Sequence, residues 1–205
     1  MRVELLAAIT PATRVLLLNA PNNPTGWTLS RDEQRAILAH CRRTGTWIVS
    51  DEVYERLYFA DGAVAAPSFL DVAEPEDRLL VVHSFSKSFL MTGWRLGYFA
   101  GPKDLVRAIN KLQSHMSSCP SSISQAAAAE ALTGDQSFVA AAAEQYRARR
   151  DLVVQRANAV DGLRALAGDG AFYVFIDCSG VIGRRTPAGV VIDSDDAFVG
   201  YLLEH

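Results

Sequence analysis

The sequence predicts an α/β domain with a mainly parallel sheet and flanking helices. Short apolar runs alternate with segments whose apolar residues recur at helical spacing, which is typical of parallel strands joined by helices. Polar residues follow three of these runs, where the strands would end. Because ligands of open α/β sheets bind outside the carboxyl ends of the strands, the same pattern predicts a ligand site.

The predicted strands lie in the first half of the chain, at residues 14–18, 46–50 and 79–83, with a fourth candidate at 94–100. A helix is predicted between the first two, because Ser30-Arg31-Asp32-Glu33 forms a capping box and Gly45 can end the helix.

Helical patterns dominate the second half, from about residue 103 to residue 160. Pro120 interrupts them because proline cannot continue a helix, and Asp135 can cap the long helix that follows. An extended stretch at residues 171–177 and a helix at 195–204 complete the predicted elements.

Composition excludes several classes of protein. The chain has 205 residues, 49% apolar and 21% charged, as in an ordinary globular protein. Its net charge of −3 provides no basic field for nucleic acid or membrane lipid, and no apolar run could span a bilayer. Scattered Cys41, Cys119 and Cys178 indicate buried reduced thiols rather than disulfides, and no residues show metal-ligand spacing. We therefore expect a cytoplasmic protein without a metal.

The segment Ser84-Phe85-Ser86-Lys87-Ser88 carries the most specific chemistry, because it places a lysine among hydroxyls at the tip of an apolar strand. A lysine amine forms an imine with an aldehyde cofactor when desolvation favours its neutral form. Hydroxyls and arginine suit a phosphate group, so Ser84 and Arg95 are candidate phosphate ligands, and Ser86 either adds a third contact or shapes the loop. Two glycines beside the arginine, Gly93 and Gly97, are expected at positions of close approach. The alternatives are an exposed loop lysine at Lys87 and a surface ion pair at Arg95.

Three residues outside this segment are candidates for the remaining contacts. A carboxylate at Asp51 can keep a pyridine nitrogen protonated, although the residue can also be a simple helix cap. The hydroxyl of Tyr54 and the amide of Asn23 can donate to a phenolic oxygen. The alternatives are a packed tyrosine and a turn asparagine, and the turn is the stronger of the two because Asn-Pro-Thr-Gly is a credible turn on composition alone. Glu52, the neighbour of Asp51, is expected to be structural.

Together these blocks resemble the class I/II aminotransferases, which are fold-type I enzymes that use pyridoxal 5'-phosphate (PLP). Their order and spacing are similar to those of the family, and the resemblance covers essentially the whole chain. The matching blocks are residues 19–26, 50–55, 84–87 and 93–98, with later matches at 112–115, 124–125 and 170–173. The resemblance implies a partial PLP-binding large domain at residues 1–145 and a partial small α+β domain at 146–205.

The resemblance also implies a role for each candidate. Lys87 would form the internal aldimine and move the proton between Cα and the cofactor. Asp51 would contact the ring nitrogen, and Asn23 and Tyr54 the ring oxygen, while the phosphate would be held by Ser84 and Arg95. The reaction would transfer an amino group between an amino acid and a 2-oxo acid, in a homodimer that binds neither nucleic acid nor membrane.

The chain resembles a middle segment of a longer enzyme. We find no counterpart of the family's phosphate-cradling turn, ring-stacking aromatic residue or arginine for the substrate carboxylate, so impaired transamination is expected. One alternative is a PLP-dependent lyase, decarboxylase or synthase of the same fold, which would share Lys87 and Asp51. Another is a non-catalytic fragment that binds partner chains or PLP weakly. A nucleotide-binding Rossmann domain is disfavoured because no G-x-G-x-x-G follows a strand.

Overall fold

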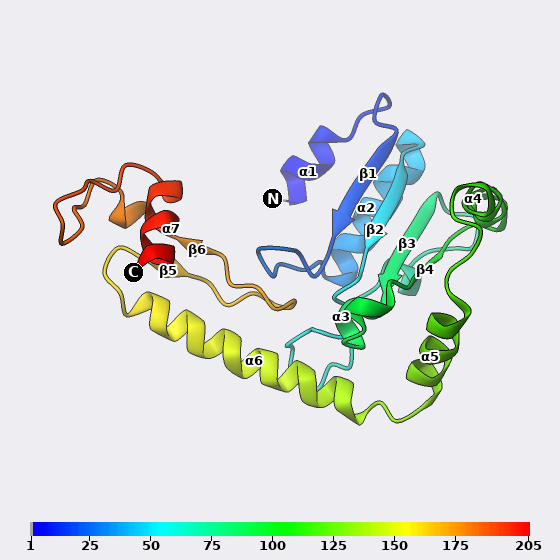
Figure 1. Cartoon of the computed structure of the whole chain (residues 1–205). Coiled ribbons are helices and arrows are strands. Elements are labelled where there is room, and N and C mark those ends of the chain that lie inside the picture. The colour runs from blue at the N-terminus through cyan, green and yellow to red at the C-terminus, as the bar shows by residue number, and fades with distance from the viewer. Residues whose placement is uncertain (1) are drawn as a thin grey trace.

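The computed structural model describes residues 2–205 and centres on a four-stranded sheet in the order β1-β2-β3-β4 (Figure 1). A separate pair of short strands, β5 and β6, lies beyond the far end of α6. The strands are β1 (Val15–Asn19), β2 (Trp47–Asp51), β3 (Leu79–Ser84), β4 (Gly97–Ala100), β5 (Arg164–Ala165) and β6 (Ile176–Asp177). The helices are α1 (Arg2–Ala8), α2 (Arg31–Thr44), α3 (Phe85–Ser88), α4 (Lys103–Met116), α5 (Ser122–Thr133), α6 (Ser137–Asn158) and α7 (Asp195–Glu204).

The main sheet is mostly parallel, as predicted. β1 pairs with β2 and β2 with β3 in parallel, whereas β4 runs antiparallel to β3. The register sets Asn19 opposite Asp51, and Asp51 opposite Val82. The carboxyl ends of three strands therefore share one edge of the sheet, where the polar residues that follow them can meet.

Helix α2 forms where the sequence places its signals. The Ser30 hydroxyl accepts from the Glu33 backbone N–H at 3.3 Å, the Glu33 carboxylate accepts from the Ser30 N–H at 2.9 Å, and Gly45 ends the helix at φ 72°. Reciprocal capping satisfies N–H groups that have no partner within the helix. The buried face of α2 forms the main core together with the sheet: Ile37, Leu38 and Cys41 cluster with Leu18, Ile48 and Val81.

The fourth predicted strand is too long at its start. Thr92–Trp94 is a 3-10 turn and Arg95 is left-handed at φ 50°, so the strand begins only at Gly97. The chain has to reverse direction here to run back along β3. Gly97 is a position of close approach, since a Cβ there would lie 2.6 Å from the His83 carbonyl oxygen. The same expectation for Gly93 is wrong, because a Cβ there would meet nothing within 4 Å.

The second half follows the predicted pattern with three corrections. Only Ile176–Asp177 of the expected extended stretch is a strand, because Ala171 turns the chain at φ 61°. Helix α6 begins at Ser137, whose N–H donates to the Asp135 side chain at 2.9 Å, so Asp135 precedes the capping position by one residue. Cys119 is exposed and Cys178 is only partly buried, so the prediction of buried thiols holds for Cys41 alone, although none of the three cysteines forms a disulfide.

Helix α6 connects the two parts of the chain. Figure 1 shows it running past the end of the main sheet towards β5, β6 and α7. The predicted domain boundary, between residues 145 and 146, therefore falls inside a continuous helix and remains a prediction. Within residues 2–205, no helix combines the length and apolar character needed to cross a membrane.

Candidate active site

The loop after β1 is fastened to the end of β2 by Asn19. Its side-chain amide donates to the Asp51 carbonyl oxygen at 3.1 Å, and its side-chain oxygen accepts from the Asn23 N–H at 2.7 Å. A hydroxyl and an N–H of Thr25 bond the Asn22 side chain at 2.7 and 3.2 Å, which closes the turn. Asn23 is thereby held at the polar edge of the sheet.

Lys87 lies in α3, a single helical turn that follows β3 directly. The Ser84 hydroxyl caps this turn by accepting from the Ser86 N–H at 3.1 Å. The Lys87 Nζ lies 5.8 Å from the ring centroid of Tyr54 and 5.4 Å from that of Phe172. Among the described residues it forms no ion pair with a carboxylate. Aromatic faces therefore hold this amine in place without neutralising it.

Tyr54 is the most connected residue of the site. It is 3% exposed, and its hydroxyl lies 2.9 Å from the hydroxyl of Tyr173. Burial raises the pKa of Tyr54, the bond to Tyr173 raises it further, and the Asn23 side chain partly offsets the rise. The Tyr54 hydroxyl consequently keeps its proton and is available as a hydrogen-bond donor.

Asp51 is half-buried at the end of β2. Burial raises the pKa of its carboxyl group, whereas the Val53 N–H, 3.3 Å from Oδ1, and the nearby His83 act in the opposite direction. The carboxylate is thus partly desolvated and faces little compensating charge. A cationic group of a ligand beside this carboxylate would compensate for the solvation that it has lost.

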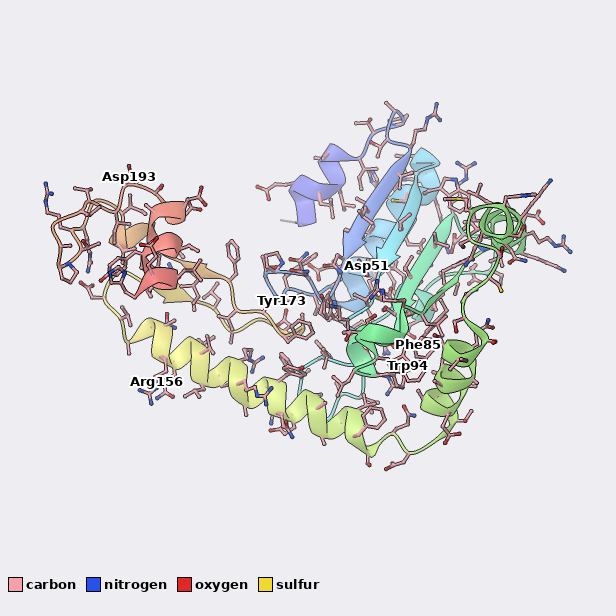
Figure 2. All side chains as sticks on the ribbon, in the orientation of Figure 1. Asp51, Phe85, Trp94, Arg156, Tyr173 and Asp193 are labelled. Carbon is pink, nitrogen blue, oxygen red and sulfur yellow. The ribbon has the colours of Figure 1, made fainter. Side chains whose placement is uncertain are left out.

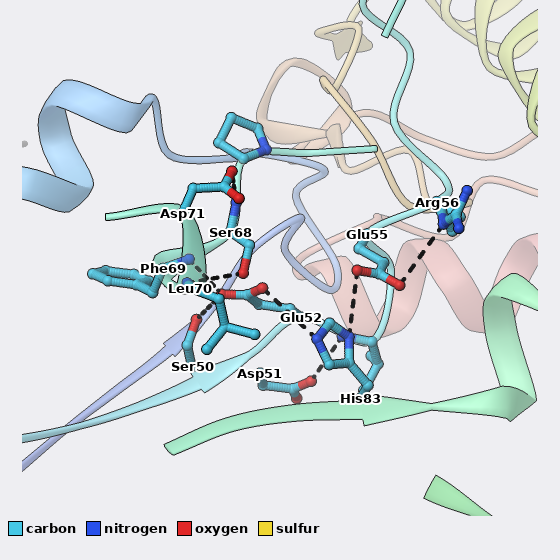
Figure 3. Close-up of polar contacts among 12 residues, drawn as sticks. Ser50, Asp51, Glu52, Glu55, Arg56, Ser68, Phe69, Leu70, Asp71 and His83 are labelled. Carbon is cyan, nitrogen blue, oxygen red and sulfur yellow. Dashed lines mark hydrogen bonds and ion pairs between the residues drawn. The ribbon is translucent and has the colours of Figure 1, made fainter. Parts of the chain in front are cut away.

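Glu52 points the other way and has a structural role, as expected. Its Oε1 accepts from the Ser50 hydroxyl at 2.8 Å and from the Phe69 N–H at 3.0 Å (Figure 3). The buried His83 ring lies between two carboxylates, 4.0 Å from Glu52 and 3.5 Å from Glu55. This cluster ties the loop after β2 to β3, and its His83 lies beside Asp51 (Figure 3).

The candidate phosphate ligands are brought together only in part. Ser84 and Ser86 share the turn that carries Lys87, and Ser86 is buried. Arg95 is exposed, and its Nη1 donates to the Thr92 carbonyl oxygen at 3.0 Å. No hydrogen bond joins Arg95 to either serine among the described residues. It remains close along the chain, because its neighbour Leu96 accepts from the Phe85 N–H at 3.2 Å.

Sequence reasoning missed two residues of the site, Phe172 and Tyr173. Their block was part of the family resemblance, but nothing local gave either residue a role. Figure 2 shows Tyr173 on the segment that returns from the far end of α6 to the sheet. The ring of Phe172 meets that of Tyr54 edge to face, with centroids 5.4 Å apart.

The residues present fit pyridoxal phosphate. The cofactor offers an aldehyde, a ring nitrogen, a ring oxygen and a phosphate. The site offers an unpaired amine, a partly desolvated carboxylate, a protonated hydroxyl with an amide beside it, and two serines at the start of a helical turn. Each functional group of the cofactor has a chemical complement.

Comparison with known proteins decides the family. The family model described as aminotransferase class I and II matches residues 2–205. The chain belongs to the class I and II aminotransferases. Pyridoxal phosphate is the cofactor that membership of this family implies.

Among curated aminotransferases, the chain is 44% identical over 202 residues to the aspartate aminotransferase of Rhizobium meliloti (strain 1021). It is also 44% identical over 204 residues to the aspartate/prephenate aminotransferase of Cereibacter sphaeroides. These matches cover 98% of this chain but only 49% and 50% of the relatives. The chain thus spans about half the length of the curated aminotransferases it matches.

Solved aminotransferase structures show the same fold. The crystal structure of the aspartate aminotransferase from Rhizobium meliloti matches with a TM-score of 0.90 at 44% identity, covering all of this chain and 51% of that one. An aspartate aminotransferase from Thermus thermophilus with maleate matches with a TM-score of 0.80 at 35% identity, over 97% of this chain and 53% of that one. The expected fold-type I architecture is therefore confirmed.

Proposed function

We propose that this chain carries the lysine-bearing half of a PLP-dependent aminotransferase active site, which transfers an amino group between an amino acid and a 2-oxo acid. The observation that carries the proposal is the position of Lys87. Its amine lies just after β3, 5.8 Å from the centroid of the Tyr54 ring, and it pairs with no carboxylate among the described residues. The names of the similar aminotransferases support the same reaction.

When bound, pyridoxal phosphate supplies an aldehyde that reacts with amines and a ring that accepts electrons. The chain's own residues hold and move protons around it. The Lys87 Nζ would move the proton between the Cα of the amino acid and the cofactor. The Asp51 carboxylate holds the proton of the ring nitrogen, and the Tyr54 hydroxyl and the Asn23 amide donate to the ring oxygen. Ser84, Ser86 and Arg95 bind the phosphate.

We propose aspartate as the first substrate to test, with prephenate as a possible acceptor. Both come from the names of the similar proteins, and the Thermus thermophilus structure contains maleate, which carries two carboxylates. An amino acid with an acidic side chain is the class that these relatives favour.

Borohydride reduction of the chain with PLP tests the assignment of Lys87. The chain has three lysines, Lys87, Lys103 and Lys111. We expect a visible absorbance band, and a pyridoxyl label on Lys87 by peptide mass spectrometry. Lys87→Ala should lose both, whereas Lys111→Ala, which changes an exposed residue of α4, should keep both. A label on Lys103 or Lys111 in the wild-type chain would refute the proposal.

We also propose a cytoplasmic location, a homodimer as the form of the complete enzyme and a role in amino-acid biosynthesis. The three free cysteines suit a reducing compartment, and the family resemblance supports the dimer. Sedimentation analysis of the complete enzyme with and without PLP tests the assembly, since a monomer in both conditions would contradict it.

A further inference from the structure

We infer that Tyr173 is a positioning residue of this site, which acts on the cofactor through the hydroxyl of Tyr54; the inference rests on the proposed function. The two hydroxyl oxygens lie 2.9 Å apart, and the rings meet edge to face at 5.8 Å. The residues are 119 positions apart in the sequence, so this pair joins the segment after β5 to the loop after β2.

The backbone fixes Tyr173 in place independently of its hydroxyl. Ala171 N–H donates to the Leu57 carbonyl oxygen at 2.8 Å, and Phe59 N–H donates to the Asp169 carbonyl oxygen at 2.9 Å. Gly170 is needed for this contact, because a Cβ there would lie 2.6 Å from the same Leu57 oxygen. A side chain held on a braced backbone can orient its partner with little entropic cost.

Counting protons shows what the hydroxyl pair does. The Asn23 side chain lowers the pKa of Tyr54, as an N–H donor to the Tyr54 oxygen would. At 2.9 Å either hydroxyl of the pair can be the donor; we assign the Tyr54 proton to the bond with Tyr173 in the chain without cofactor, because that bond raises the pKa of Tyr54. When the ring oxygen of the cofactor lies beside Tyr54, the Tyr54 hydroxyl donates its hydrogen bond to that oxygen instead. Tyr173 has its own proton and becomes the donor to Tyr54.

This exchange keeps the Tyr54 oxygen paired in both states. It also strengthens the bond to the ring oxygen, because a hydroxyl that accepts a hydrogen bond is a better donor. Removing the Tyr173 hydroxyl should therefore leave the ring oxygen's negative charge less stabilised. The consequence is a change in the pH at which the loaded site titrates, which loss of packing alone would not produce.

The test compares Tyr173→Phe with Tyr146→Phe. Tyr146 belongs to the same aromatic cluster, with its ring 5.5 Å from that of Phe172, but its hydroxyl forms no hydrogen bond with the described residues. In the cofactor-free chain, the ¹³Cζ resonance of Tyr54 should move in Tyr173→Phe and stay in place in Tyr146→Phe. An unmoved resonance in Tyr173→Phe would show that the hydroxyl pair is absent and would overturn the inference.

The second measurement is the pH midpoint of the visible absorbance change in the chain loaded with PLP. Tyr173→Phe should raise the midpoint by about half a pH unit, in the same direction as Tyr54→Phe and by less, since one neutral hydrogen bond is lost. Tyr146→Phe should titrate like the wild type. A wild-type chain without a visible band would refute the proposed function. A normal band with an unshifted Tyr173→Phe midpoint would refute only the role of Tyr173.

Discussion

Asp51 shows at the residue scale how a site residue can cost stability. Burial raises the pKa of its carboxyl group, and the bond from Val53 offsets this only in part. A carboxyl group that is harder to ionise in the folded state lowers stability at pH values above its unfolded pKa. The ionised Asp51 carboxylate therefore lowers the stability of the fold. The proposed contact with the ring nitrogen of the cofactor would explain why an ionisable residue stands at this position.

Asp51→Asn should separate these two effects. Asparagine keeps an oxygen for the Val53 N–H and removes the charge, so the urea midpoint of the cofactor-free chain at pH 7 should equal or exceed that of the wild type. Affinity for PLP should fall about tenfold or more, because a charge-assisted bond is lost. Urea unfolding and absorbance titration with PLP measure the two quantities. A less stable variant with unchanged affinity would identify Asp51 only as a cap of the turn after β2.

Individual residues also show why the sequence predicted some of the site and not the rest. Asp51 ends β2, and Lys87 and Asn23 lie within four residues of the ends of β3 and β1, so strand pattern alone places the three at one edge. Tyr173 reaches Tyr54 through a turn at Ala171, on a segment that returns from the far end of α6 (Figure 2), which no local pattern contains. The role of Arg95 stays a prediction, because its left-handed conformation and its bond to Thr92 do not establish a phosphate contact.

At the scale of elements, α2 depends on local capping. Ser30→Ala removes the hydroxyl that accepts from the Glu33 N–H and should destabilise the chain by about 1 kcal/mol. Ser122→Ala is the matched control: this serine is exposed at the start of α5, and its hydroxyl bonds no described residue. The control should stay within about 0.5 kcal/mol of the wild type in urea unfolding. Equal losses in both variants would show that the capping box contributes nothing.

The other end of α2 is joined to the turn before β3 by an ion pair. Arg42 donates to Asp77 through Nε at 2.7 Å and Nη2 at 2.6 Å, and the Glu74 N–H donates to the same carboxylate at 2.7 Å. The bond from Arg42 is the main cause that lowers the pKa of Asp77. Two-point pairing of this kind is geometrically specific and fixes the helix against the sheet.

This pair predicts an acid-dependent contribution to stability. A carboxyl group with a lowered folded-state pKa stabilises the fold above its unfolded pKa, and that stability is lost as the pH falls through the folded-state value. Asp77→Asn should therefore lower the urea midpoint at pH 7, and its difference from the wild type should shrink as the pH falls below about 4. Urea titrations of both proteins at pH 7 and at pH 3 measure this difference in midpoint. A difference that stays constant down to pH 3 would exclude the ionised pair as its cause.

Helices and strands also differ in how well the sequence predicts where they begin and end. The bounds of α7 agree with the predicted helix, and α2 follows from its capping box and Gly45, because these signals act within a few residues. The predicted strand begins three residues before the observed one, because Trp94 and Leu96 are apolar residues that continue the pattern of a strand. Their conformation is instead set by the reversal that brings β4 alongside β3.

At the scale of the whole molecule, apolar side chains remain on the surface of an edge strand. Val15 and Leu17 of β1 are 53% and 69% exposed, while Leu18 of the same strand is buried in the core. Among the described residues, β1 pairs only with β2, so its outer edge offers free backbone groups beside apolar side chains. Such an edge is a template for pairing with another chain.

We therefore predict that the 205-residue chain associates with itself through β1. Sedimentation velocity should show the weight-average size rising with protein concentration, and Leu17→Lys should reduce that rise because a charge on an edge strand opposes pairing. Val64→Lys is the matched control, since Val64 is 76% exposed in a loop away from the sheet edge. It should associate like the wild type. A wild-type chain that stays monomeric at every concentration would contradict the prediction. An equal reduction in both variants would place the contact elsewhere, with added charge acting through general repulsion between chains.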